Sequence, residues 1–141
     1  MLRFLPALIL LAAPASHATA TRLEFSPQRA EHQAAADEYA AIWATDGSRI
    51  VDVLEKIVGA TLPDPLIQVI VFEDVSNSGQ SGKPMYLRAS YPYDVKQATL
   101  VHELAHRYMD ALDVKFACYS DVHEPLALVL AETWGQLWGR S

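Results

Sequence analysis

The chain has 141 residues, of which 51% are hydrophobic and 20% charged, and its net charge is −6. This balance is typical of one globular domain with an apolar core and excludes a disordered chain. Lysine and arginine residues are scattered along the sequence. We therefore expect no nucleic acid partner, because phosphate binding needs a concentrated basic patch.

The first twenty residues predict a cleavable signal peptide. Arg3 supplies the positive start, residues 4–15 form an apolar run, and Ala18-Thr19-Ala20 matches the small-x-small cleavage pattern. The run is too short for a permanent transmembrane helix, although an N-terminal membrane anchor is the alternative. We expect cleavage after Ala20, a secreted or periplasmic protein without a stable membrane span, and one mature domain at residues 21–141.

The first half of the mature chain predicts two helices and a strand. Ser26 and Pro27 suit the N-cap and first position of a helix over 27–44. A turn at Asp46-Gly47-Ser48 would separate it from a second helix over 48–58. Residues 66–72 are apolar and β-branched at almost every position, which predicts a central strand covered on both faces.

The second half predicts a loop, a short strand and two more helices. Residues 73–83 are rich in serine and glycine, and residues 85–89 follow Pro84 as an edge strand. A helix over 94–112 opens on a capping box of Asp94 and Gln97. After a loop over 113–123, the last helix starts at Pro125 and continues to about residue 138.

The helix over 94–112 contains His102-Glu103-Leu104-Ala105-His106, an HExxH motif. Two histidines four positions apart lie on one face of a helix, so their imidazoles can converge on one zinc ion. Glu103 can reach the zinc-bound water without binding the metal, and it can take the proton of that water. The alternative is a pair of solvated histidines without a metal, but the helical setting favours zinc.

In this setting the chain resembles the gluzincin-type zinc metallopeptidases, the peptidase MA-like HExxH zincins. The resemblance is specific at His102, Glu103 and His106, and elsewhere it concerns only the order of the elements. It implies a compact α+β zincin-like domain with backing helices, a small mixed sheet, an active-site helix and a C-terminal helix. It also implies a peptide or protein substrate, which would pair with the edge strand over 85–89.

The third zinc ligand is expected on the last helix, since gluzincins use a glutamate there. Seventeen residues (107–123) separate His106 from Glu124, and twenty-five separate it from Glu132. The shorter spacing is nearer that of the family, and Glu132 shares a polar stripe with Gln136, which is typical of a solvated helix face. Glu124 is therefore the predicted ligand. Glu132 and His123 are the alternative ligands.

Other residues have less specific roles. The donor to the transition-state oxyanion could be His123, Tyr108 or Tyr119. The lone Cys118 cannot form an internal disulfide and is read as a buried or spectator thiol. We expect His32 at the surface, and we expect three tryptophans in the core, at Trp43, Trp134 and Trp138.

The sequence thus predicts an exported zinc metallopeptidase in which water activated by Glu103 attacks a peptide carbonyl. One alternative is a catalytically silent zinc-binding interaction module, and another is a helical structural protein without metal. The presence of Glu103 favours the enzyme, because a site that only binds zinc does not need this base.

Overall fold

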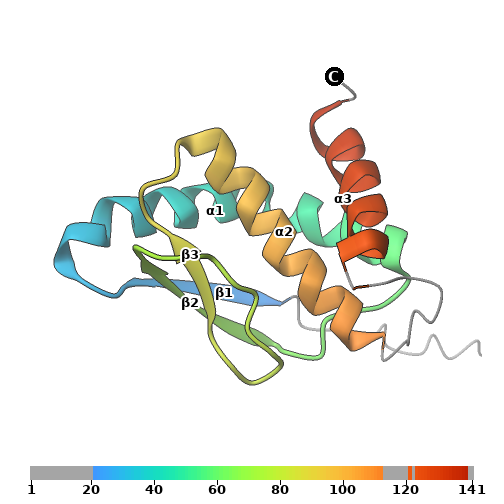
Figure 1. Ribbon diagram of the computed structural model, residues 1–141, viewed down its shortest axis with the longest axis horizontal. Helices are drawn as coiled ribbons and strands as arrows, with labels where there is room; N and C mark the ends of the chain where they lie inside the picture. The colour runs from blue at the N-terminus through green and yellow to red at the C-terminus, as the bar shows by residue number, and fades with distance from the viewer. Residues whose placement is uncertain (1–20, 113–120, 122, 140–141) are drawn as a thin grey trace, which may run out of the picture.

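The computed structural model describes residues 21–112, 121 and 123–139. The predicted signal peptide, Cys118 and Tyr119 lie outside the described residues. The fold is α+β, as predicted, with a three-stranded sheet and three α-helices (Figure 1). Its elements in chain order are β1 (Arg22–Pro27), a 3-10 turn (Ala30–His32), α1 (Gln33–Val58), β2 (Leu66–Phe72), β3 (Met85–Arg88), α2 (Tyr93–Ala111) and α3 (His123–Trp138).

The sheet has the order β1-β2-β3, and both pairings are parallel. β2 is the central strand with the predicted bounds, and β3 is an edge strand as predicted. The prediction of a mixed sheet is wrong for these strands. The prediction that β2 is covered on both faces is also wrong, because Ile67, Val69 and Val71 are buried whereas Leu66 and Gln68 on the other face are exposed.

The strand β1 occupies residues that were predicted to begin a helix. Ser26 and Pro27 end this strand, so their assignment as helix cap and first helical residue is wrong. The strand pairs with β2 in a register that places Arg22 opposite Leu66. Pro27 is tolerated because it lies at the end of an edge strand, where its missing N–H disrupts little of the ladder.

One continuous helix, α1, replaces the two predicted helices and the turn at Asp46-Gly47-Ser48. Gly47 is buried in the middle of this helix, and a Cβ at this position would lie only 2.7 Å from the Trp43 ring. The close packing of Trp43 on Gly47 and the burial of Ile50 and Leu54 keep the helix intact. This packing outweighs the cost of a helical glycine, about 1 kcal/mol.

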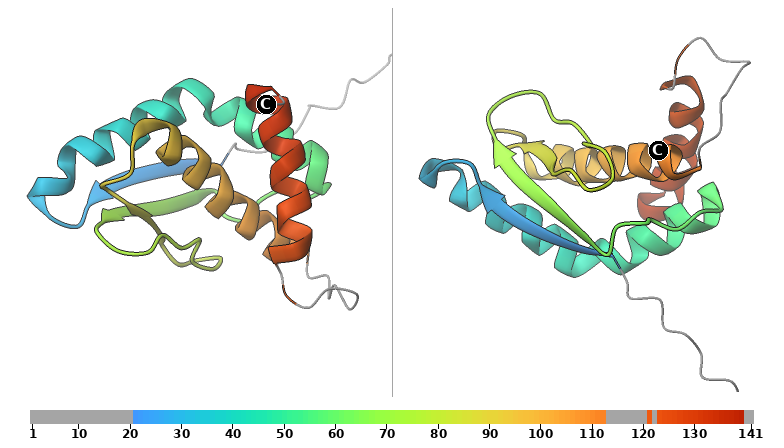
Figure 2. Two further views of the ribbon diagram at one scale, coloured as in Figure 1. Left: turned by 45° about the horizontal axis from the view of Figure 1, so that its top comes forward. Right: turned by 90° about the horizontal axis from the view of Figure 1, so that it is seen from below.

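The helices α2 and α3 complete the domain (Figure 2). α2 begins at Tyr93 without a side-chain cap, so the predicted capping box is wrong; Gln97 instead donates a hydrogen bond to Asp46 at 3.4 Å. α3 begins at His123, two residues before the predicted start, and packs on α1 and α2. Within residues 21–112, 121 and 123–139, no helix combines the length and apolar character that a membrane span needs.

Three further expectations concern single residues. His32 is 6% exposed, so its prediction as a surface residue is wrong. Trp43 and Trp134 pack against the core as predicted. Trp138 is 42% exposed and does not belong to the core.

The connection over 73–84 joins two parallel strands without a helix. It must therefore return past the length of the strands, antiparallel to β3. On the way it forms an isolated antiparallel bridge between Asn77 and Tyr86. The chain predicted as a flexible loop thus makes ordered contacts with the sheet edge, which include this bridge and a hydrogen bond of 3.0 Å from the Arg88 N–H to the Ser76 hydroxyl.

Arg107 of α2 fixes the second half of this connection. Its guanidinium donates hydrogen bonds to the carbonyls of Ser78 and Lys83 and forms an ion pair with Asp64 at 3.1 Å. The side chain of Arg107 is 2% exposed and that of Asp64 is 15% exposed. Gly79 packs against Pro84 and Arg107, since a Cβ there would be 2.1 Å from the Pro84 carbonyl oxygen and 3.0 Å from Arg107 Nη2, and its φ is +62°.

We expect Arg107→Ala to lower the free energy of unfolding by about 3 kcal/mol or more, because it removes the charged partner of Asp64 and the hydrogen bonds to two carbonyls. Urea unfolding followed by circular dichroism, with a chelator present so that metal binding does not contribute, measures this loss. Arg22→Ala is the matched control, since the Arg22–Glu24 pair is exposed and its loss should cost less than about 1 kcal/mol. Similar values for the two variants would contradict the structural role of Arg107.

Candidate active site

The motif residues lie on α2 with the geometry expected from their spacing. The ring centroids of His102 and His106 are 4.9 Å apart. Leu104 and Ala105 between them are fully buried, which fixes the helix against the core, whereas both histidines are partly exposed. The helix therefore presents two adjacent imidazoles at the surface.

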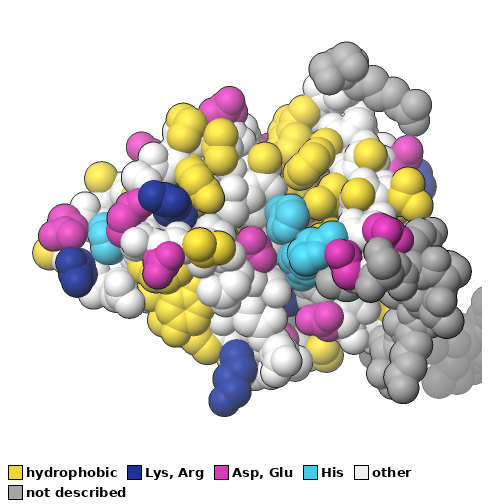
Figure 3. Space-filling view, in the orientation of Figure 1, with side chains coloured by type: hydrophobic (Ala, Val, Ile, Leu, Met, Phe, Trp, Pro, Cys, Tyr) yellow, Lys and Arg dark blue, Asp and Glu magenta, His cyan; other side chains and the backbone are white. Residues whose placement is uncertain are grey.

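His123, the first residue of α3, brings a third imidazole to this pair. Its ring centroid lies 5.3 Å from that of His106, and the two rings are nearly perpendicular. Figure 3 shows histidine side chains grouped on this face of the molecule. The chain thus joins residues from two helices, and only two of these three histidines belong to the sequence motif.

Asp121 holds His123 in place. The Asp121 carboxylate accepts a hydrogen bond from the backbone N–H of His123 at 2.6 Å and lies 3.3 Å from its Nδ1. The contact engages Nδ1, so Nε2 is the nitrogen that remains for a metal ion. A carboxylate on the second ring nitrogen is a common partner of metal-binding histidines.

The separations between the rings fit a shared zinc ion. Two imidazoles bound to one tetrahedral zinc, each with a Zn–N distance of about 2 Å, have ring centres roughly 5 Å apart. Both measured separations, 4.9 and 5.3 Å, are close to this value. The described residues contain no group of three or more His, Cys, Asp or Glu side chains already arranged to hold an ion.

The electrostatic setting favours neutral imidazoles. Burial lowers the pKa of His102, and the neighbouring His123 lowers it further. Burial also lowers the pKa of His106, with additional contributions from His102 and His123. Neutral imidazole is the form that binds a metal, so His102 and His106 lose little free energy to deprotonation at neutral pH.

Glu103, the residue that follows His102 on α2, is a buried carboxylate. Glu103 is only 6% exposed, and this burial raises the pKa of its carboxyl group to about 7. A base whose pKa lies near the working pH is well suited to accept and return a proton. The position of Glu103 is therefore compatible with acid–base chemistry.

A cavity of about 350 Å³ opens next to Glu103. It lies among residues of the 73–84 connection, the turn before α2, α2 itself and α3. Its lining is Val75, Ser76, Tyr91, Ala98, Thr99, His102, Glu103 and Trp134. Two aromatic residues in this lining, Tyr91 and Trp134, had no predicted role at a site, because neither belongs to a motif and only the tertiary fold brings them here.

The other sequence candidates lie outside this cavity. Glu124 is exposed on the first turn of α3, directly after His123. Glu132 is also exposed and accepts a hydrogen bond from Gln136 at 3.0 Å, in agreement with a polar stripe. Tyr108 is fully buried, and burial together with Glu55 of α1 raises its pKa. Its hydroxyl is therefore not available to a substrate in the cavity.

The site thus combines imidazoles from two helices, one buried carboxylate and an adjoining cavity. Such a set can bind a divalent cation and move a proton near it. Comparison with known proteins adds no relative to this picture. No protein-family model, curated protein sequence or solved structure matches the chain.

Proposed function

We propose that the protein is a zinc-dependent metallopeptidase with a zincin-like fold. The observation that carries this proposal is the buried Glu103, which lines one cavity together with His102. Zinc, when bound, polarises the peptide carbonyl and lowers the pKa of water. Glu103 accepts the proton of the attacking water and then transfers it to the departing amine. The Glu103 carboxylate is therefore unprotonated again at the end of the cycle.

His102 and His106 are the first two proposed ligands. The sequence predicts Glu124 as the third zinc ligand, but the contacts of His123 favour His123 as this ligand. Its ring touches the ring of His106, and Asp121 holds its Nδ1. Both candidates lie on the first turn of α3, so this turn supplies the third ligand under either assignment.

The proposed substrate is a peptide or protein in the periplasm or outside the cell. The cavity beside Glu103 has an aromatic and aliphatic lining away from the motif residues, as the positions of Tyr91, Ala98 and Trp134 indicate. An apolar side chain of the substrate fits such a cavity, because its burial releases water from apolar surface. Export by a signal peptide that is cleaved after Ala20 belongs to the same proposal.

A zinc-binding module without catalysis is the second candidate. Such a module would need the histidines but not a carboxylate at the cavity wall. Among the residues that the structure describes, none forms an ion pair with Glu103, and burial of its carboxylate costs free energy, which its raised pKa reflects. This cost favours the enzyme, since groups at catalytic sites often have strongly shifted pKa values.

We expect protein purified without chelators to contain about one zinc ion per chain, as a site with three protein ligands predicts. Elemental analysis by mass spectrometry measures the content. Removal of the metal with a chelator should lower the melting temperature, because an ion that binds only the folded state stabilises it. His102→Ala should contain no zinc and should show no change on chelation. A parent protein that contains no transition metal would overturn the proposed function.

A further inference from the structure

Two residues of the cavity wall, Ser76 and Tyr91, are held by Arg88, the last residue of β3. The backbone N–H of Arg88 donates a hydrogen bond to the Ser76 hydroxyl at 3.0 Å. The Arg88 guanidinium lies over the Tyr91 ring, 5.6 Å from its centroid. Ser76 belongs to the 73–84 connection and Tyr91 to the turn before α2. Arg88 therefore joins two separate parts of the wall.

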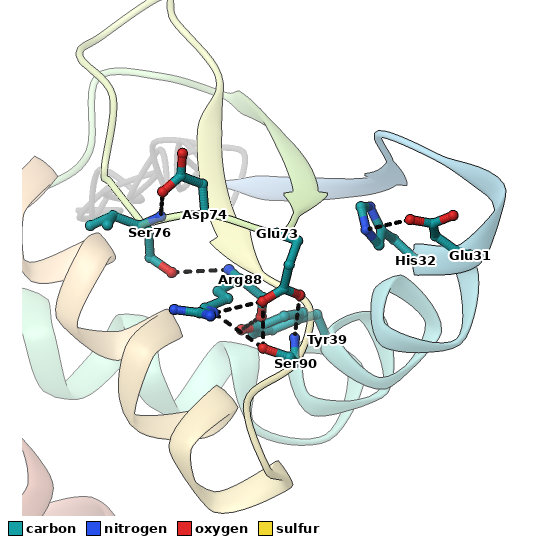
Figure 4. A network of polar contacts seen from close by, with 9 residues as sticks. Glu31, His32, Tyr39, Glu73, Asp74, Ser76, Arg88 and Ser90 are labelled. Atoms are coloured by element: carbon teal, nitrogen blue, oxygen red, sulfur yellow. Dashed lines mark hydrogen bonds and ion pairs between the residues drawn. The ribbon is translucent and has the colours of Figure 1, made fainter.

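The Glu73 carboxylate fixes the side chain of Arg88 (Figure 4). It accepts hydrogen bonds from Arg88 Nε at 2.7 Å and from the Ser90 backbone N–H at 3.1 Å. The hydrogen bond from the Ser90 hydroxyl, and then that from Arg88, lower the pKa of Glu73, so this carboxylate stays ionised at neutral pH. The Arg88 carbonyl in turn accepts a hydrogen bond from the Tyr39 hydroxyl of α1 at 2.9 Å. Both the side chain and the backbone of Arg88 are thus held in place.

Trp134 of α3 forms another part of the wall. Figures 1 and 2 show α2 between the segment that follows β3 and helix α3. Trp134 lines the cavity, but its Nε1 is buried from solvent. The part of the indole that meets the cavity is therefore its hydrocarbon surface. The cavity thus has aromatic carbon on its wall from two elements that lie on either side of α2.

Small side chains on α2 provide the space of the cavity. Ala98 and Thr99 lie one helical turn before His102 and Glu103, and all four residues line the cavity. A longer side chain at Ala98 would occupy part of this space. The volume of about 350 Å³ lies within the range of small-ligand sites, about 300–1,000 Å³.

We propose that the cavity binds an aromatic group between Tyr91 and Trp134, and that Arg88 and Glu73 are positioning residues that hold Tyr91 for this contact. Contacts between rings add to the burial of apolar area, so an aromatic group gains more from such walls than an aliphatic group of similar size. Arg88 covers one face of the Tyr91 ring, which leaves the other face or the ring edge for the ligand.

The role of this aromatic group in cleavage rests on the proposed function. Glu103 and His102 line the same cavity as Tyr91 and Trp134. A substrate side chain that fills the cavity therefore places its own backbone next to the carboxylate that activates water. The aromatic residue of the substrate accordingly lies directly beside the bond that is cleaved.

Benzyl alcohol and cyclohexylmethanol test the aromatic preference without any cleavage, because they share one skeleton, differ in the ring and contain no peptide bond. Each is titrated into the purified protein while NMR follows the amides of Ala98 and Thr99 and the indole N–H of Trp134. We expect these signals to shift. In Tyr91→Leu the ratio of the two affinities should move about 3–10-fold towards cyclohexylmethanol. Tyr91→Phe should keep the parental ratio, because it keeps the ring.

The ratio compares two ligands on one protein, so a general loss of stability leaves it unchanged. If the signals of Ala98, Thr99 and Trp134 do not respond up to the solubility limit of benzyl alcohol, the cavity is not an aromatic site. The same conclusion follows if Tyr91→Leu keeps the parental ratio.

Arg88→Met tests the positioning role, because it removes the guanidinium but keeps the backbone contacts of this residue. We expect Arg88→Met and Glu73→Gln to move the affinity ratio in the same direction as Tyr91→Leu, by at least about 2-fold. Arg22→Met is the matched control, since Arg22 also pairs with a glutamate on the sheet, at 2.8 Å, but lies on β1. It should keep the parental ratio. Parental ratios in both Arg88→Met and Glu73→Gln would contradict the positioning role.

Ala98→Leu tests whether the two alcohols enter this cavity. The longer side chain should weaken the binding of both by at least about 10-fold, because it fills the space that they need. Ala127→Leu, at an exposed position of α3, is the control and should keep both affinities. Equal affinities in the Ala98→Leu variant and the parent protein would overturn the inference.

Cleavage of a peptide library connects the cavity with the proposed function. The bonds that the parent protein cleaves should lie next to phenylalanine, tyrosine or tryptophan, and this preference should weaken in Tyr91→Leu. Cleavage without any preference for aromatic residues would overturn the role of the cavity in cleavage. If the protein binds benzyl alcohol as expected but cleaves no peptide, the proposed function fails and the aromatic site stands.

Discussion

The variant Glu103→Gln should retain zinc and the fold, but its peptidase rate should fall by about 10²–10⁴-fold. This is the usual contribution of a positioned acid–base group. Glutamine has nearly the same shape, so it preserves the packing of this buried position, but it cannot accept the proton of water. Cleavage of a fluorogenic peptide library, followed under conditions where the zinc content of both proteins is matched, measures the loss.

Glu132→Gln is the matched control for this experiment, because Glu132 is an exposed carboxylate on α3 that bonds to Gln136. It should keep the parental rate. Peptide cleavage by Glu103→Gln at the rate of the parent would show that Glu103 is not the base. Loss of zinc from this variant would instead indicate that Glu103 acts as a ligand.

The second large effect concerns the third zinc ligand. We expect His123→Ala to weaken zinc binding by about two orders of magnitude or more, because two imidazoles and water hold zinc less well than three protein ligands. Glu124→Ala should have a much smaller effect. Asp121→Asn should weaken binding by about 10–100-fold, as the loss of a carboxylate partner of a ligand does. Competition with a chromophoric chelator gives the affinities.

Glu132→Ala serves as the reference with unchanged affinity. If Glu124→Ala loses zinc while His123→Ala keeps it, the assignment from the sequence spacing is correct and the contact of His123 with His106 has another role. If the His123→Ala variant, the Glu124→Ala variant and the parent protein bind zinc with equal affinity, neither residue on the first turn of α3 is a ligand.

The parts of the fold that could be predicted are those with a strong local pattern. The apolar run of β2 and the helix that carries the motif are examples, since their residues repeat with the period of their own structure. The strand β1 was missed because its alternation is weak and its partner β2 lies far along the chain. The break expected at Gly47 fails because Trp43 packs there, which is a tertiary effect.

The same distinction applies to the site. The spacing of His102 and His106 fixes their neighbourhood on one helix, so the sequence predicts that they are adjacent. His123 was named as a candidate ligand, but its contact with His106 depends on how α3 docks. The cavity residues Tyr91 and Trp134 belong to different elements and share no motif. Only the packed fold brings them beside Glu103.

The parallel pairing of β1 with β2 also affects how the chain folds. Arg22 pairs with Leu66, so this ladder closes a loop that contains the whole of α1. Helix α1 gains its hydrogen bonds locally and can form within microseconds, whereas strands distant in sequence must first overcome the entropy of loop closure. We therefore expect β1, although first in the order of synthesis, to join the structure late. Such a delay would keep a chain unfolded for export, because the β1–β2 ladder cannot form until β2 has been synthesised.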